Sequence, residues 1–177
     1  MTQHDDAPDR ARRDGKDGDL AIVGRTVLIN KPRQEVYAFW RDFSNLPNFM
    51  RAVDAITTEG SLTRWTVKAP LGQSVTLVTE ITEDVPGSVI AWRSTEESQI
   101  KTEGRVSFTD AVGDRGTAVT AEIRYEPPAD DLGRLAAKLF GAEPNIQARH
   151  ELKRFKMLLE TGEIATAINH HDQENND

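Results

Sequence analysis

The order of the hydrophobic patterns constrains this chain more than any single motif does. A short helical pattern at residues 33–50 is followed by six stretches with the two-residue alternation of β-strands, and then by a long amphipathic helical pattern. Consecutive antiparallel strands must bury one face, and the last helix is the only large apolar cover that remains for it. The order therefore predicts a curved sheet that grips one helix and encloses a pocket.

A further strand precedes the first helix, so we expect seven antiparallel strands and an α+β fold. Pro32 is placed to open the first helix, where its missing N–H costs nothing, and Ser44 is placed to cap a second short helical turn. The strands are expected at residues 23–30, 53–58, 62–69, 75–84, 89–95, 104–110 and 118–126.

The C-terminal helical pattern has two parts, with a break at Gly141 and Pro144. The second part is expected to cover residues 144–161, with Gly162 as its C-cap. Leu152 and Phe155 lie on its apolar stripe, so we expect both side chains to be buried against the sheet.

Strand pairing can be predicted for one hairpin. A two-residue turn at Pro86-Gly87 pairs Asp84 with Val89, and by extension Ile81 with Trp92 and Glu80 with Arg93. The Ile81–Trp92 pair is expected on the inner face. The ion pair is expected on a solvated outer face, where it contributes only about 0–1 kcal/mol.

Composition limits the classes of function. The chain has 177 residues, a net charge of −7 and no cysteine. An acidic balance argues against binding to a phosphate backbone, and no apolar run is long enough for a membrane span. The cysteine-free sequence and the absence of a signal-peptide pattern favour a cytoplasmic location. We expect one domain at residues 20–167 between disordered tails at residues 1–19 and 168–177.

The sequence offers no catalytic motif, so no catalytic residue, cofactor or metal site is predicted. His150 is the only histidine in the predicted domain, and its position off the apolar stripe of its helix indicates solvent exposure. Several charged residues of the strands are expected to form a solvated outer face: Arg64, Lys68, Glu103, Arg105, Glu122 and Arg124.

Several segments together resemble the polyketide cyclase/dehydrase and lipid-transport family. They are residues 33–50, 81–87, 90–94, 106–108, 124–128, 138–141 and 152–156. That family belongs to the START-like (SRPBCC) superfamily with the helix-grip fold. The resemblance, which covers roughly residues 22–165, implies two short helices after the first strand and a deep apolar cavity between the curved sheet and the long C-terminal helix. Its members include aromatase/cyclases and coenzyme Q-binding proteins.

Three functions fit this expectation. The first is binding of a hydrophobic small molecule or lipid-like ligand in the cavity. The second is a cyclase or dehydratase, in which wall groups such as Arg93, Arg105 or Tyr125 would polarise carbonyls. The third is an interaction protein whose cavity is collapsed. The ligand and the oligomeric state stay open. The residues expected to contact the ligand are Trp65, Leu77, Trp92, Phe108, Phe140, Leu152 and Phe155.

Overall fold

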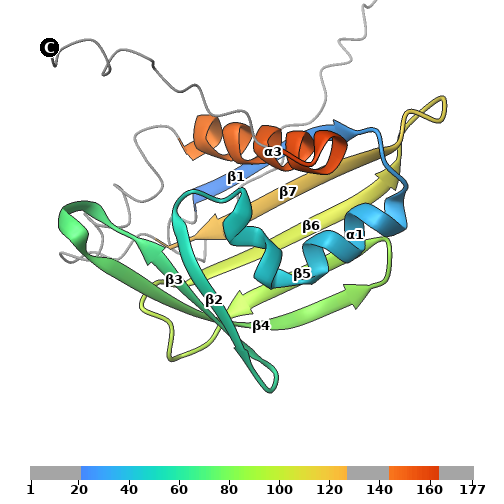
Figure 1. The fold of residues 1–177 in the computed structure, drawn as a ribbon. Helices are drawn as coiled ribbons and strands as arrows, with labels where there is room; N and C mark the ends of the chain where they lie inside the picture. The colour runs from blue at the N-terminus through green and yellow to red at the C-terminus, as the bar shows by residue number, and fades with distance from the viewer. Residues whose placement is uncertain (1–20, 127–143, 164–177) are drawn as a thin grey trace, which may run out of the picture.

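The computed structural model describes residues 21–126 and 144–163, which form one curved antiparallel sheet with helices on its inner side (Figure 1). The strand order is β1-β7-β6-β5-β4-β3-β2, so every neighbour except the β1–β7 pair is consecutive in the chain. The strands are β1 (Ala21–Ile29), β2 (Val53–Glu59), β3 (Leu62–Lys68), β4 (Ser74–Val85), β5 (Val89–Ser94), β6 (Thr102–Asp110) and β7 (Thr117–Tyr125).

The helices are α1 (Arg33–Arg41), the short 3₁₀ helices η1 (Phe43–Asn48) and η2 (Pro70–Gly72), and α3 (Pro144–Thr161). The predicted α+β helix-grip fold is therefore confirmed, and the predicted strand ends lie within two residues of the observed ones. Within the described ranges, no helix is both long and apolar enough to cross a membrane. The tails, Phe140 and Gly141 lie outside the described residues.

Pro32 precedes α1 in an extended conformation, and its carbonyl accepts hydrogen bonds from the backbone N–H groups of Glu35 and Val36.

The cap of η1 differs from the prediction. The cap of η1 is Asp42, whose carboxylate accepts from the backbone N–H of Ser44 at 3.2 Å. The prediction that Ser44 caps this turn is wrong because Asp42, which comes before the turn, already reaches the free N–H.

The β4–β5 hairpin confirms two of the three predicted pairs. Ile81 lies opposite Trp92 and Glu80 lies opposite Arg93, but Asp84 pairs with Ile90 and not with Val89. The turn has three residues, 86–88, and a bulge between Ile81 and Glu83 compensates for the extra residue. The two deviations cancel, so the inner Ile81–Trp92 pair keeps its predicted register.

Helix α3 is tied to β1 along its second half. Lys156 Nζ donates to the carbonyl of Leu28, and the backbone N–H of Asn30 donates to Glu160 Oε1 at 2.8 Å. The helix has the predicted bounds, and Gly162 follows it in the left-handed region with φ of 76°. Leu152 and Phe155 are buried as predicted.

Candidate ligand cavity

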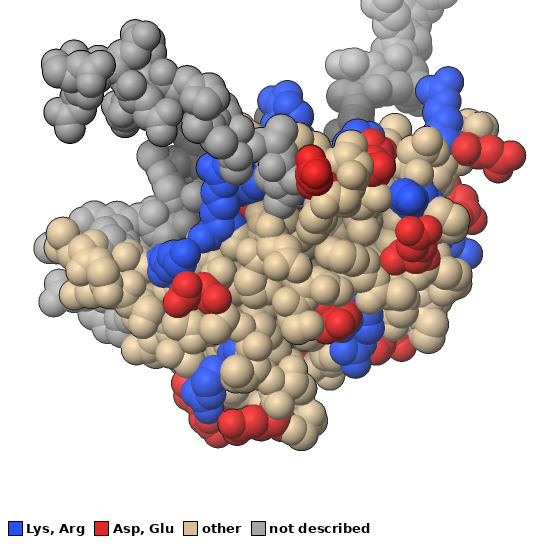
Figure 2. All heavy atoms as spheres, in the orientation of Figure 1, with Lys and Arg blue, Asp and Glu red and all other residues tan. Residues whose placement is uncertain are grey.

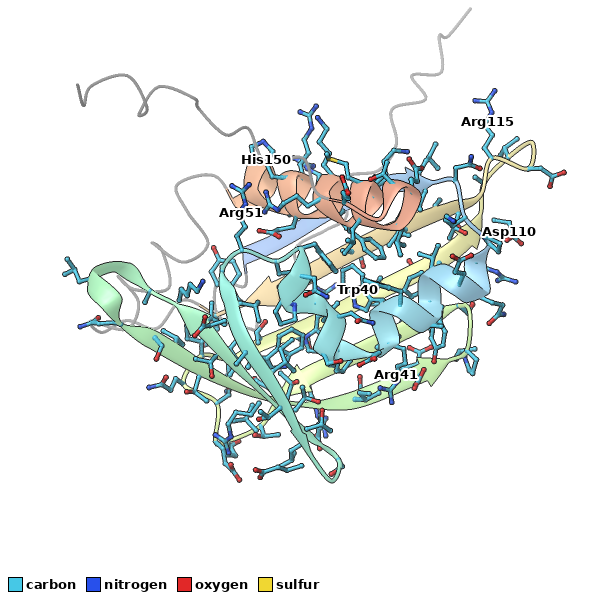
Figure 3. The ribbon with its side chains drawn as sticks, in the orientation of Figure 1. Trp40, Arg41, Arg51, Asp110, Arg115 and His150 are labelled. Atoms are coloured by element: carbon cyan, nitrogen blue, oxygen red, sulfur yellow. The ribbon has the colours of Figure 1, made fainter. Side chains whose placement is uncertain are left out.

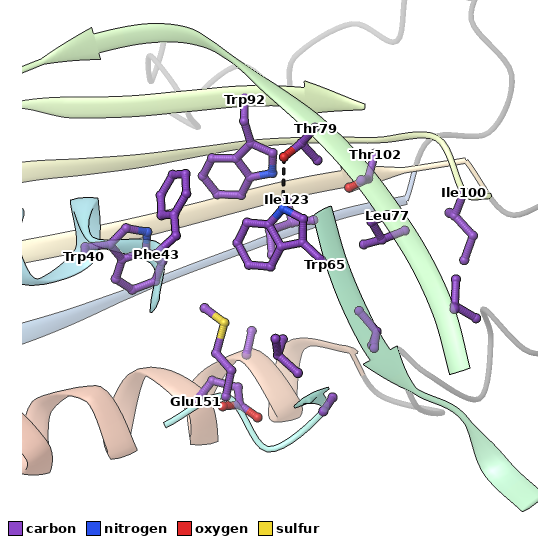
Figure 4. Close-up of a pocket in the computed structure, with 16 residues that line it drawn as sticks. Trp40, Phe43, Trp65, Leu77, Thr79, Trp92, Ile100, Thr102, Ile123 and Glu151 are labelled. Atoms are coloured by element: carbon purple, nitrogen blue, oxygen red, sulfur yellow. Dashed lines mark hydrogen bonds between the residues drawn. The ribbon is translucent and has the colours of Figure 1, made fainter. Parts of the chain in front are cut away.

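A cavity of about 210 Å³ lies between the sheet and the first half of α3 (Figure 4). Trp65 of β3 and Trp92 of β5 lie in its wall on the sheet side, and η1 and its flanking residues contribute Phe43, Met50, Ala52 and Val53. Its lining consists of Trp40, Phe43, Met50, Ala52, Val53, Trp65, Val67, Val75, Leu77, Thr79, Trp92, Ile100, Thr102, Ile123, Ala148 and Glu151. Thirteen of these sixteen residues are apolar, which is the composition of a site for a hydrophobic molecule.

The position of the Trp92 indole depends on a glycine. Gly104 lies directly opposite Trp92 in the β5–β6 pair, and the indole lies over it. A Cβ at Gly104 would come within 2.1 Å of the ring. Because no side chain fits there, Gly104 allows the indole to lie close to the sheet and leaves space above it for a ligand.

The two threonines of the wall are already engaged in hydrogen bonds. Thr79 Oγ1 accepts from Trp65 Nε1 at 2.9 Å, which fixes the plane of that indole (Figure 4). The Thr102 hydroxyl donates to the carbonyl of Arg124 at 3.1 Å. These bonds satisfy polar groups of the wall within the protein and leave a largely apolar surface towards the cavity.

Glu151 is the one charged residue among the described residues of the wall, and the sequence did not predict it. One of its carboxylate oxygens, Oε1, forms an ion pair with Arg154, whose Nε also donates to the carbonyl of Phe49 at 2.9 Å. Burial raises the pKa of the Glu151 carboxyl above its ordinary value, although Arg154 and Arg51 act in the opposite direction.

The position of Glu151 on the apolar face of α3 could have been predicted from helical spacing. Ala148, Glu151, Leu152 and Phe155 stand at i, i+3, i+4 and i+7, so they share one face of α3. The acidic residue interrupts the apolar stripe, and this interruption was the available signal. His150, in contrast, is exposed on the outer side of the helix, as predicted (Figure 3).

The predicted ligand-contacting residues separate into two groups. Trp65, Leu77 and Trp92 line the cavity. Phe108, Leu152 and Phe155 are buried beside it without forming its wall, and Phe140 lies outside the described residues.

The buried group belongs to the main hydrophobic core, which contains an aromatic cluster around Phe155. The ring centroid of Phe155 lies 4.9 Å from that of Phe49, 5.0 Å from that of Trp40 and 6.0 Å from that of Phe39. We call this region the packed end, defined by Ile29, Phe49, Val106, Phe108, Val119 and Phe155, all at most 1% exposed. The hollow end is the sheet wall of the cavity, defined by Trp65, Val67, Val75, Leu77 and Trp92.

The arginines considered for catalysis lie on the opposite face of the sheet. Arg93 Nε donates to Glu80 Oε1 at 2.8 Å, and Arg105 pairs with Glu83. Their side chains are 64% and 48% exposed, so neither lines the cavity, and the expectation that they act as wall groups is wrong. Tyr125 is buried at the end of β7 but is not part of the lining either.

Charges of both signs are interspersed over the surface. Arg64, Lys68, Glu103 and Arg124, which were predicted on the outer face, form the ion pairs Arg64–Glu97, Lys68–Asp54 and Arg124–Glu103 at 3.4 to 3.6 Å. On the face seen in Figure 2, blue and red side chains border a largely uncharged centre. Among the described residues, no group of three or more His, Cys, Asp or Glu side chains is arranged to hold a metal ion.

Comparisons with known proteins agree with this geometry. Residues 29–153 match the family described as polyketide cyclase / dehydrase and lipid transport. A structural-genomics protein from Deinococcus radiodurans is 36% identical, with a TM-score of 0.64, over 81% of this chain and 100% of that chain. An uncharacterized 17.2 kDa protein from Streptomyces lincolnensis is 27% identical over 80% of this chain and 91% of its own length.

The solved structures also include an aromatase/cyclase from a Streptomyces species. It is 15% identical, with a TM-score of 0.60, over 82% of this chain and 99% of that chain. At this identity the likeness shows a shared fold.

Proposed function

The chain belongs to the polyketide cyclase/dehydrase and lipid transport family, and on this premise we propose that it binds a hydrophobic small molecule or lipid-like ligand in the cavity between the sheet and α3. The observation that carries the proposal is the apolar wall, in which Trp65, Leu77 and Trp92 face a volume of about 210 Å³. Removing apolar surface from water contributes about 25 cal/mol per Å², offset by the cost of immobilising the ligand.

The polar residues in and around the wall favour ligand binding over catalysis. Thr79 and Thr102 already form hydrogen bonds within the protein, and the exposed arginines of β5 and β6 are on the other face. The open volume counts against an interaction protein with a collapsed cavity. The cytoplasmic location expected from the sequence stays a prediction.

One observation favours a cyclase or dehydratase as the second candidate. Glu151 is a carboxyl whose pKa burial raises, in an apolar wall, and such a group is suited to general acid–base catalysis. Likeness to an aromatase/cyclase in fold is compatible with this candidate. It predicts that an offered poly-β-ketone chain is recovered cyclised or dehydrated, whereas a binding protein returns its ligand unchanged.

Two measurements test binding. Native mass spectrometry of protein purified without delipidation should show a co-purifying hydrophobic molecule. Titration of the delipidated protein with α-methylnaphthalene, followed by tryptophan fluorescence, should saturate with micromolar-scale affinity, on the order of −8 kcal/mol. Folded protein that binds no probe saturably would contradict the proposal.

A cavity-filling substitution locates the bound probe. Ala148 faces the cavity from α3, and Ala148→Phe should fill part of it and weaken probe binding by about ten-fold, roughly 1.4 kcal/mol. Arg149→Phe is the matched control because it introduces the same side chain at the next, exposed position of the helix. Equal affinities in the two variants would place the probe elsewhere.

A further inference from the structure

One oxygen in the cavity wall has no hydrogen-bond partner among the described residues. It is Glu151 Oε2, which is buried, while Oε1 of the same carboxylate is paired with Arg154. Buried polar atoms in proteins nearly always have a partner, because an unpaired one loses its hydration without compensation. The Glu151 side chain reaches the cavity from α3, opposite the tryptophans of the sheet (Figure 4). Because Oε2 itself is covered, a ligand in the cavity would reach it through a rotation of the Glu151 carboxylate.

The charge around Glu151 restricts the group that fits there. Glu151 and Arg154 neutralise each other, and both side chains are largely buried, at 19% and 14% exposed. A cationic ligand would add an uncompensated charge to an apolar cavity, and an anionic one would be repelled by the carboxylate. Arg51 acts on the Glu151 carboxylate through a hydrogen bond from its backbone N–H and through its charge, but its side chain is exposed and that charge is screened by solvent. A neutral donor, of which a hydroxyl is the simplest, avoids both costs.

We propose that the ligand of this cavity is an apolar molecule that carries a hydroxyl group, and that Glu151 Oε2 accepts a hydrogen bond from it. This inference rests on the proposed function and adds to it a class of ligand and the residue that selects that class. The apolar wall supplies affinity for the body of the molecule. Glu151 supplies the preference for a hydroxyl at the α3 side, since a hydrogen bond to a carboxylate is stronger than one between neutral groups.

The test compares two probes of nearly the same shape, α-naphthol and α-methylnaphthalene, which differ by a hydroxyl in place of a methyl group. The quantity measured is the ratio of their dissociation constants for the full chain at neutral pH. Comparing this ratio between variants cancels the difference in hydrophobicity of the two probes. Glu151→Met removes the acceptor at similar volume, and we expect the preference for the naphthol to fall about ten-fold.

Two further variants keep the test decisive. Glu151→Gln preserves the shape and a neutral acceptor, so it should lose about three-fold of the preference, and it serves if the methionine variant does not fold. Glu122→Gln is the matched control. It makes the same change of charge on an exposed residue of β7, and it should leave the ratio of the wild-type protein unchanged.

The outcomes distinguish a failure of the hydroxyl preference from a failure of the proposed hydrophobic binding. A ratio that is the same in the wild-type protein and in the Glu151 variants, with both probes binding, would overturn the hydroxyl preference and leave hydrophobic binding intact. An equal fall in Glu122→Gln would also overturn the inference, because the effect would then be one of net charge. Failure of both probes to bind the folded wild-type protein would overturn the proposed function itself.

Discussion

The packed end and the hollow end share one sheet face and one helix, yet they are filled differently. Strand β6 passes through both: Phe108 near its end is fully buried in the packed end, whereas Thr102 at its start faces the cavity. Helix α3 repeats the division, with Ala148 and Glu151 over the cavity and Phe155 in the cluster. The comparison indicates that the packed core and the proposed binding space occupy separate lengths of the same elements.

The cover over the sheet explains the division. At the packed end, α1 adds Tyr37, whose ring contacts Phe108, and Trp40, whose ring contacts Phe155 and also borders the cavity. At the hollow end, the wall rings lie along the sheet: Trp92 covers Gly104, and Trp65 is held by Thr79. Side chains that border an open volume lose dispersion contacts on one side, so the hollow end is less stabilising without a ligand.

The largest expected effect is on stability, at the packed end. Phe155→Ala removes a ring that contacts three other aromatic rings, and it should lower the free energy of unfolding by about 3–5 kcal/mol. Denaturant melts of the two proteins measure the loss. Leu77→Ala at the hollow end should cost less, because Leu77 already borders open space. A loss near 1 kcal/mol for Phe155→Ala would show free space beside it and break the comparison.

The next effect concerns binding, at the hollow end. Gly104→Ala places a methyl group where the Trp92 ring lies, so the ring must move toward the cavity. We expect the affinity for α-methylnaphthalene to fall about ten-fold, with a loss of about 1–3 kcal/mol in stability from overpacking. Gly24→Ala in β1 is the matched control, since its Cβ would meet only an ordinary contact at 3.7 Å. Unchanged affinity in Gly104→Ala would mean that the position of Trp92 does not shape the binding space.

The smallest expected effect is on stability, and it is the pH dependence of the difference between the wild-type protein and Glu151→Gln. Burial raises the pKa of Glu151, so the ionised form is disfavoured in the folded state. At pH values above the raised pKa, where the side chain is ionised, this lowers the free energy of unfolding of the wild-type protein. Glu151→Gln should therefore be slightly more stable than the wild-type protein at neutral pH, by less than about 1 kcal/mol. As the pH falls through the raised pKa toward the ordinary carboxyl value, the wild-type side chain becomes protonated and the difference should vanish.

Thermal melts of both proteins across this pH range provide the measurement. A glutamine variant that is less stable at neutral pH and becomes equal only in alkaline solution would contradict the assigned sign. Glu122→Gln should show neither effect, because its side chain is exposed on β7.

Alternation and helical spacing were sufficient to predict the seven strands and the bounds of α3. The Ile81–Trp92 pair was predicted from the Pro86-Gly87 turn, and it is correct because the longer turn and the bulge cancel. Alternation and helical spacing identify which face of an element is buried. They do not give the distance between a buried face and the element that packs on it. Phe108 and Trp92 therefore looked equivalent in the sequence, although Phe108 lies in the core and Trp92 lines the cavity. Glu151 was missed for a related reason: a charged residue on an amphipathic helix is ordinarily expected on the solvent side.

The most direct test of the division is an NMR titration of methyl-labelled protein with α-methylnaphthalene. The ring current of a bound probe shifts only nearby methyl groups. We predict shifts at the cavity methyls of Val67, Val75, Leu77, Ile100 and Ile123, and unshifted signals at the packed-end methyls of Ile29, Val106 and Val119. Shifts spread equally over both sets, or confined to the packed end, would contradict the account.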